Sequence, residues 1–189
     1  MPVSVTSRCV LVCAIGRGQD NSMIDKSERD GGHDFDWEFG TWATHVRVLH
    51  SPLSADATWV EYEGTSLVRP LSGGRANVVE LDVANASGRI QGLSLRLYNV
   101  AGRQWSLNFA GLDGVLTPPT IGSFVDGRGE FYGMETLRER AVLVRFLILD
   151  VTEDSARFEQ SYSPDGGQTW ELNWVANDTR IAPSDPAAL

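Results

Sequence analysis

The amino-acid sequence predicts an all-β domain, an antiparallel up-and-down barrel of about ten strands. Apolar and polar residues alternate with a period of two through most of the chain, which is the pattern of half-buried strands. Turn-forming residues recur about every ten positions, and no segment has the longer apolar periodicity of a helix. A meander of this length exposes two strand edges unless it closes on itself, so we expect a closed barrel.

The first half of the chain gives five expected strands, each ended by a turn. The strands are rich in Val, Leu, Tyr and Trp, which favour extended backbone. The turns between them contain Gly, Ser, Asn or Pro, as in Ser72-Gly-Gly74 and Ala101-Gly102. A short helical turn is expected before the first strand, at residues 34–40. The expected strands are residues 41–50, 58–68, 75–83, 90–98 and 104–110.

The second half of the chain gives five more strands. Asp126-Gly127 and Pro164-Asp-Gly-Gly167 are strong hairpin signals between them. A β-sandwich is the structural alternative, but it needs long crossovers between its sheets, and the single long connection is Gly111–Pro119. The expected strands are residues 120–125, 130–137, 141–151, 156–162 and 169–177.

We expect the barrel domain to span residues 33–181, with an N-terminal extension at 1–32 and a C-terminal tail at 182–189. The extension holds both cysteines, Cys9 and Cys13, so the domain has no disulfide framework. The apolar run around these cysteines makes a poor signal peptide, and a start at Met23 would remove it. We therefore expect a cytoplasmic protein, with export through this segment as the alternative.

Charge and motif content exclude several classes of protein. A net charge of −9 without a basic run argues against a nucleic-acid partner and against an anionic membrane surface. No apolar stretch approaches the roughly 20 residues of a membrane-spanning helix. His33, His45 and His50 lack the spacing of metal ligands, and residues 51–189 contain neither His nor Cys to bind haem iron. We expect no metal and no cofactor.

The start of the first expected strand, Gly40-Thr-Trp42, resembles the Gly-x-Trp signature of lipocalin barrels. In that family the tryptophan closes one end of the barrel against an arginine that follows the last strand. Arg180 stands at the matching position here. The resemblance implies a barrel of the lipocalin or fatty-acid-binding-protein kind, with Gly40, Trp42 and Arg180 at its closed end.

The wider sequence resembles a bacterial family of lipocalin-like, calycin-type domains of unknown function, over about residues 34–181. This resemblance implies the same fold and brings no established activity or catalytic residue with it. The segments that carry it are Glu63–Ser66, Arg69-Pro70, Gly73–Asn77, Leu95–Tyr98, Arg103–Ser106, Gly129–Gly133, Val144–Phe146, Ser163–Trp170 and Asn173-Trp174.

The segment Ser163-Pro-Asp-Gly-Gly-Gln-Thr-Trp170 matches the Asp-box of sialidases. Sialidases carry several such boxes, one in each propeller blade, whereas this chain carries one. We interpret the segment as a hairpin in which Asp165 binds turn amides and Trp170 packs beneath the loop.

Charged residues inside apolar strands are the strongest candidates for a site. Hairpin counting places Arg145 opposite Glu159, which in turn faces Asn173, and it places Arg96 between two further polar residues. Such rows form either ion pairs on the solvent face or a polar belt inside the barrel. An inward arginine could bind a carboxylate or carbonyl, and an inward glutamate could act as a base. The two expected rows are Glu80–Arg96–Asn108 and Arg145–Glu159–Asn173.

Three functions from different classes fit this sequence. The first is binding of a small hydrophobic or amphipathic molecule in the barrel, with its polar end at Arg145 or Arg96. The second is a cofactor-independent cyclase or isomerase, with Glu159 or Glu63 as the base. The third is a structural or homo-oligomeric barrel whose interior is filled by side chains. The candidate ligand-binding residues are Arg145, Arg96, Asn108, Asn173, Tyr98, Trp59, Trp105 and Trp174.

Overall fold

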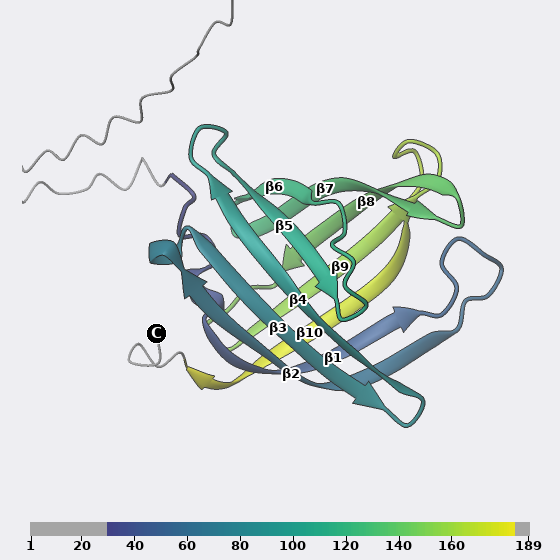
Figure 1. Cartoon of the computed structure of the whole chain (residues 1–189), viewed down its shortest axis with the longest axis horizontal. Helices are drawn as coiled ribbons and strands as arrows, with labels where there is room; N and C mark the ends of the chain where they lie inside the picture. The colour runs from purple at the N-terminus through teal and green to yellow at the C-terminus, as the bar shows by residue number, and fades with distance from the viewer. Residues whose placement is uncertain (1–29, 184–189) are drawn as a thin grey trace, which may run out of the picture.

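Ten antiparallel strands follow one another around a closed barrel, as the sequence predicts (Figure 1). The structure, a computed structural model, describes residues 30–183. A short 3-10 turn, η1 (Asp36–Glu38), precedes the barrel, and a second, η2 (Ser72–Gly74), joins two of its strands. The strands are β1 (Gly40–Leu49), β2 (Trp59–Leu71), β3 (Ala76–Asn85), β4 (Gly88–Asn99), β5 (Gln104–Gly111), β6 (Thr120–Val125), β7 (Arg128–Leu137), β8 (Arg140–Leu149), β9 (Ser155–Ser163) and β10 (Glu171–Pro183).

Closure comes from the pairing of the first strand with the last. β1 and β10 are antiparallel neighbours, with Thr44 opposite Asp178 and Trp42 opposite Arg180. This ladder leaves no open edge in the sheet, which excludes the β-sandwich alternative.

The turns have the local chemistry that tight hairpins require. Asp126 and Gly127, which join β6 to β7, have φ angles of 52° and 78°. Positive φ at both central residues is the signature of the type I′ turn, whose twist matches that of the flanking strands. The expected Asp-Gly hairpin is therefore confirmed.

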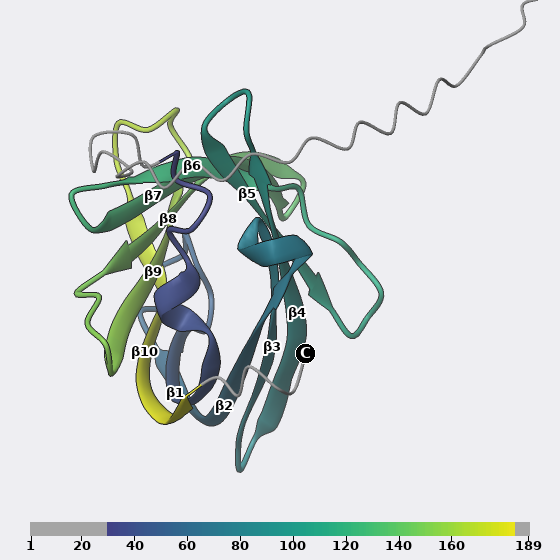
Figure 2. The same ribbon diagram turned by 90° about the vertical axis from the view of Figure 1, so that its left-hand side faces the viewer.

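The segment before β1 closes one end of the barrel. Figure 2 shows the purple stretch that contains η1 lying across this end. Phe35 is fully buried there, with its ring edge-on to Trp105 at 4.9 Å and to Phe124 at 5.1 Å. Aromatic packing of this kind makes the segment part of the hydrophobic core.

The domain extends beyond the boundaries that the sequence suggests. Asp30 forms an ion pair with Arg75 at 3.2 Å, and the carbonyl of Gly31 accepts a hydrogen bond from Trp105 Nε1 at 2.9 Å. β10 continues to Pro183, which pairs with Gly40, rather than ending near residue 177. The expected leader around Cys9 and Cys13, the alternative start at Met23 and most of the C-terminal tail lie outside the described residues.

Candidate functional site: a cavity inside the barrel

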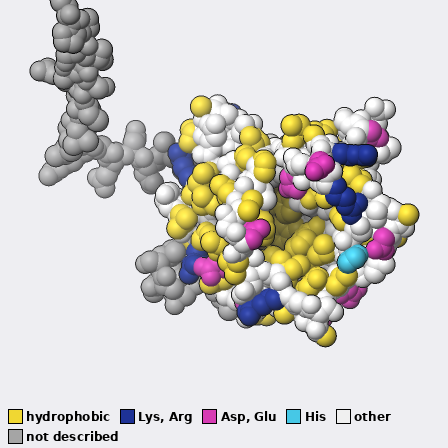
Figure 3. All heavy atoms as spheres, turned by 45° about the vertical axis from the view of Figure 1, so that its right-hand side comes forward, with side chains coloured by type: hydrophobic (Ala, Val, Ile, Leu, Met, Phe, Trp, Pro, Cys, Tyr) yellow, Lys and Arg dark blue, Asp and Glu magenta, His cyan; other side chains and the backbone are white. Residues whose placement is uncertain are grey.

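The barrel encloses a cavity of about 350 Å³. Figure 3 shows the hollow, with hydrophobic side chains on its inner surface and charged side chains around its rim. This volume lies within the roughly 300–1,000 Å³ typical of ligand pockets. A purely structural barrel would have an interior filled by side chains, and the interior of this barrel is not filled.

The walls of the cavity are aromatic and aliphatic. Phe146, Phe158 and Trp174 line one side from β8, β9 and β10. Phe158 lies 6.2 Å from Phe146, ring centre to ring centre, so the two rings form a continuous surface. Such walls favour the flat or hydrocarbon body of a ligand.

A buried ion pair lies at the inner end of the cavity. Glu38 from η1 and Arg96 from β4 bind each other through both carboxylate oxygens, with Arg96 Nη2 3.0 Å from Oε1. Their side chains are only 2% and 5% exposed. The guanidinium also lies 4.3 Å above the ring of Phe35. Bidentate geometry and stacking on an aromatic face together hold the Arg96 side chain in one orientation.

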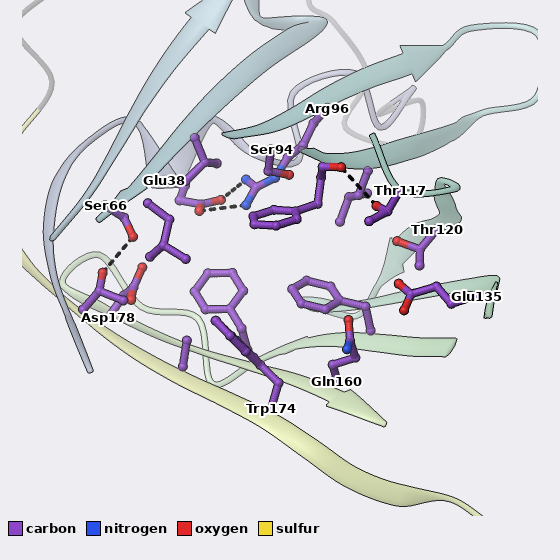
Figure 4. Close-up of a pocket in the computed structure, with 18 of the residues that line it drawn as sticks. Glu38, Ser66, Ser94, Arg96, Thr117, Thr120, Glu135, Gln160, Trp174 and Asp178 are labelled. Atoms are coloured by element: carbon purple, nitrogen blue, oxygen red, sulfur yellow. Dashed lines mark hydrogen bonds and ion pairs between the residues drawn. The ribbon is translucent and has the colours of Figure 1, made fainter. Parts of the chain in front are cut away.

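Asp178 on β10 is a second carboxyl group at this end (Figure 4). Burial, and secondarily the charge of Glu38, raise the pKa of Asp178 to about 7. A hydrogen bond from Thr44 and the charge of Arg96 act in the opposite direction. The cavity thus contains an acid that is close to half-ionised at neutral pH.

The hydroxyls of Thr44 and Ser66 extend this polar end. The two oxygens lie 2.8 Å apart in a buried hydrogen bond, and both residues line the cavity. Among the described residues, Asp178 Oδ1 and Arg96 Nε have no hydrogen-bond partner although both atoms are buried. Buried polar atoms without a partner are costly, which makes them candidates for contact with a ligand.

The opposite end of the cavity carries a second polar group (Figure 4). Tyr162 donates a hydrogen bond to Glu135 Oε2 at 2.8 Å. Burial, followed by the charge of Glu135, raises the pKa of the Tyr162 hydroxyl, which therefore stays protonated. Thr117 and Thr120 lie beside this pair and complete the polar border.

The structure brings two of the sequence-predicted ligand residues, Arg96 and Trp174, into the cavity. The expected row around Arg96 is wrong, because its neighbours are Asn77 on β3 and Leu107 on β5. Pairing that differs by an odd number of residues reverses the face. The expected partners Glu80 and Asn108 consequently point outward, and Arg96 points inward without them.

Arg145 and Glu159, two members of the second expected row, lie on the outer face of the barrel. Arg145 pairs with Ser161, two residues from the expected Glu159, so the residues share a face but are not opposite each other. Phe146 and Gln160 line the cavity, and strand alternation turns Arg145 away from it. Its guanidinium lies 4.7 Å from the ring of Trp170 outside the barrel.

Neither glutamate expected to act as a base reaches the cavity. Glu159 is on the outer face and binds Arg157, with a separation of 2.7 Å between Oε1 and Nε. Glu63 is exposed on β2, and its odd spacing of three residues from the cavity residue Ser66 places it on the outer face. A base inside the barrel must therefore be another residue.

The remaining candidate ligand residues do not line the cavity. Trp105 and Tyr98 pack against each other at the closed end, with ring centres 5.2 Å apart. Asn173 is buried at an irregularity in β10 and accepts a hydrogen bond from the cavity residue Gln160 at 3.1 Å. Trp59 lies on the outer face under Arg47, and Asn108 binds backbone oxygen atoms of Leu95 and Ser106.

The three residues expected at the closed end do meet there. Arg180 lies 4.0 Å above the ring of Trp42 and donates to the carbonyls of Trp37 and Phe39, the latter at 2.8 Å. Gly40 begins β1 with a φ of 129°, a conformation that other residues rarely adopt.

Sequence reasoning missed Glu38, Asp178, Thr44 and Ser66. One available signal was the period of two along the last strand. Trp174 was a candidate ligand residue and Arg180 a candidate closing residue, and Asp178 lies an even number of residues from each, which places it on the same face of a continuous strand. No comparable signal exists for Glu38, because it lies in a turn before the first strand.

The single Asp-box forms the hairpin device that we expected. Asp165 Oδ1 accepts a hydrogen bond from the Thr169 amide at 2.9 Å, and Oδ2 accepts one from its hydroxyl at 2.6 Å. Ser163 Oγ accepts from the Gly167 amide at 2.8 Å. The two bonds from Thr169, followed by one from the Ser163 hydroxyl, lower the pKa of Asp165 to about 2.

Within residues 30–183, no group of three or more His, Cys, Asp or Glu side chains is arranged to hold a metal ion. No helix within these residues combines the length and apolar composition needed to cross a bilayer.

Comparison with known proteins identifies the fold. No family model matches the chain, and no curated protein matches it. The S-type phycobiliprotein lyase CPES from Guillardia theta is 12% identical with a TM-score of 0.54, over 82% of this chain and 98% of that one. At this identity the likeness shows a shared barrel fold. The resemblance to bacterial lipocalin-like domains stays a prediction.

Two further solved structures align less well. A de novo designed fluorescence-activating β-barrel is 12% identical with a TM-score of 0.43, over 78% of this chain and 97% of that one. EF1p2_mFAP2b bound to DFHBI is 9% identical with a TM-score of 0.43, over 79% and 98%.

Proposed function

We propose that the barrel binds one small amphipathic molecule, with its hydrophobic body between the aromatic walls and its polar end beside Arg96 and Asp178. The observation that carries this proposal is the cavity of about 350 Å³ with apolar walls and buried polar atoms at its inner end. Convergence of a few polar groups in a mainly apolar cavity is the usual composition of a ligand site.

Arg96 supports the proposal because it retains donors beyond those that bind Glu38. A guanidinium has about five N–H groups, and Glu38 binds through one on each terminal nitrogen. Arg96 Nε is buried and has no partner among the described residues. An acceptor atom of the ligand, or a water bound together with it, would satisfy part of this capacity.

Binding can be tested with the neutral fluorophore N-phenyl-1-naphthylamine, followed by its fluorescence and by native mass spectrometry. We expect one saturable site. The variant Ser94→Phe adds a ring to the cavity wall, because Ser94 points into the cavity. Its affinity should fall by about tenfold or more, equivalent to about 1.4 kcal/mol.

The matched control is Thr65→Phe, which places the same ring on the exposed face of β2. This variant should bind the fluorophore as the unmodified protein does. Non-saturable binding, or equal affinities in the two variants, would contradict a site inside the barrel.

One observation favours a second function, acid–base catalysis of an isomerisation or cyclisation. The cavity holds Asp178, whose pKa of about 7 suits a group that accepts and returns a proton near neutral pH. The test is deuterium uptake from heavy water at the carbon next to the carbonyl in a panel of small cyclic ketones. Uptake that depends on the protein and is lost in Asp178→Asn would support catalysis, whereas no uptake across the panel would leave binding alone.

A further inference from the structure

The cavity has an excess of acidic groups. Its lining includes the carboxyl groups of Glu38, Glu135 and Asp178, and Arg96 is the single base among the described residues that line it. The charge of Arg96 is already matched by Glu38 in a bidentate ion pair. A ligand that enters the cavity therefore meets unmatched negative charge and no unmatched positive charge.

Asp178 is the acidic residue of this group that has an oxygen atom inside the barrel without a partner in the described part of the chain. The residue is only 5% exposed, and its Oδ1 atom has no hydrogen-bond partner among the described residues. Its neighbours on the flanking strands, Thr44 on β1 and Ala156 on β9, carry no charge. The carboxyl therefore has one oxygen available to a group inside the cavity.

Three charged side chains lie near Asp178 from the elements packed around it. Glu38 on η1 and Arg96 on β4 act on it with opposite signs, and the effect of Glu38 is the larger. Arg180, two residues further along β10, is directed to the carbonyls of Phe39 and Trp37 at the closed end. The larger effect of the Glu38 carboxylate favours a positive charge beside Asp178.

We propose that the natural ligand is a hydrophobic amine, whose protonated nitrogen binds Asp178 while its hydrocarbon body lies between the aromatic walls. This inference rests on the proposed binding function and names the class of ligand. The ammonium group would satisfy Asp178 Oδ1, which lacks a partner among the described residues, and would replace the proton that the carboxyl otherwise holds.

The same geometry disfavours the ligand that the sequence alone suggested for an inward arginine. A carboxylate beside Arg96 would also lie near Glu38 and Asp178, and it would compete with Glu38 for the guanidinium. A neutral alcohol avoids this repulsion but leaves an ionised Asp178 without a cation. Trp174 and Phe158, which line the adjacent wall, add attraction for a cation over an aromatic face.

The experiment compares three probes with the same ring system: 1-naphthylmethylamine, 1-naphthylmethanol and 1-naphthoate. Calorimetric titration at pH 8 should give the tightest binding for the amine, weaker binding for the alcohol and the weakest for the carboxylate. Between pH 6 and pH 8 the amine affinity should rise about tenfold, because the ionised fraction of an acid with a pKa of about 7 rises by that factor. The alcohol affinity should not rise with pH.

Asp178→Asn should reduce amine affinity to the level of the alcohol and remove its pH dependence. The control is Glu159→Gln, which neutralises a carboxylate on the outer face of the neighbouring strand and should leave the amine preference intact. The pH series on the unmodified protein tests the same point if the Asp178 variant fails to fold.

The outcomes separate this inference from the function on which it rests. Equal affinity for alcohol and amine, a preference for the carboxylate, or an amine preference that survives in Asp178→Asn would overturn the inference while binding stands. Failure of all three probes to bind would overturn the proposed function and the inference together.

Discussion

The carboxylate of Glu38 and the guanidinium of Arg96 bind each other inside the barrel although 58 residues separate them in the sequence. One belongs to the turn before the first strand, and the other belongs to β4. The pair joins the segment that closes the barrel to the wall of the cavity. The same contact occupies the Arg96 guanidinium and places the charge of Glu38 near Asp178, where it adds to the effect of burial and raises the pKa of that carboxyl.

Removing one member of this pair should be more harmful than removing both. Glu38→Gln leaves the buried Arg96 cation unmatched and should lower the free energy of unfolding by about 3–5 kcal/mol. The double variant Glu38→Gln, Arg96→Met should cost less than Glu38→Gln alone, because it leaves no buried charge unmatched. Urea denaturation followed by tryptophan fluorescence measures both quantities.

The control for this prediction is an exposed ion pair. Arg89 binds Asp82 across two strands, with Nε and Oδ1 2.7 Å apart, where solvent screens the charges. Asp82→Asn should have a much smaller effect than Glu38→Gln. Equal losses in the two variants would show that burial of the inner pair has no energetic consequence.

Asp178 should make the protein less stable as the pH rises. Burial raises its pKa from 3.8 to about 7, so the folded protein binds more protons than the unfolded chain between these values. The contribution of Asp178 to the free energy of unfolding is highest below about pH 4, and it falls as the pH rises from 4 to 7. The free-energy difference between the unmodified protein and Asp178→Asn should change by about 3 kcal/mol from pH 5 to pH 8, in favour of the variant.

Urea denaturation at several pH values checks this slope. Parallel curves for the two proteins would contradict a raised pKa. In Glu38→Gln the decline should be smaller and should end at a lower pH, because Asp178 loses a neighbouring negative charge and keeps the positive charge of Arg96.

The sequence carries enough information for the fold because strands are encoded locally. Alternation and turn chemistry, such as Asp126-Gly127, predict the ten strands, and the cost of open edges predicts closure. The strand ends were less predictable. β10 runs through Pro183 because its pairing with β1 continues, and a pairing partner about 140 residues away leaves no local signal.

The site was less predictable because it depends on register. Arg96 and Arg145 are both single charges in apolar strands, yet the first points inward and the second outward. A one-residue difference in pairing decides between these outcomes, and turn position alone did not fix it. Glu38 was beyond this reasoning, since a residue outside the sheet has no register that could place it in the cavity.

The Asp-box hairpin should respond to pH in the opposite sense to Asp178. Hydrogen bonds from Thr169 and Ser163 lower the pKa of Asp165 from 3.8 to about 2. A lowered pKa stabilises the fold above the unfolded value, and this contribution is lost as the pH falls through 4 toward 2. Asp165→Asn should therefore lower the melting temperature at pH 7, and the difference should narrow below pH 4. A constant difference across this range would contradict the lowered pKa.

Arg180 should stabilise the closed end of the barrel, and a lysine at this position should not replace its contribution. Its guanidinium lies 4.0 Å from the centre of the Trp42 ring and donates to the carbonyls of Trp37, Phe39 and Glu153, which needs several N–H groups on one side chain. Arg180→Lys keeps the charge but loses most of these bonds, so it should lower the free energy of unfolding by about 2–3 kcal/mol.

The matched control is Arg47→Lys, because Arg47 also lies over a tryptophan, Trp59, at 5.1 Å but is 43% exposed on the outer face. Urea denaturation should show little loss for this variant. Hydrogen exchange should show faster exchange at η1 and the start of β1 in Arg180→Lys alone, because Arg180 binds the carbonyls at both places. Equal losses in the two variants, with unchanged exchange near Trp42, would mean that the closed end is held by its aromatic packing without the arginine.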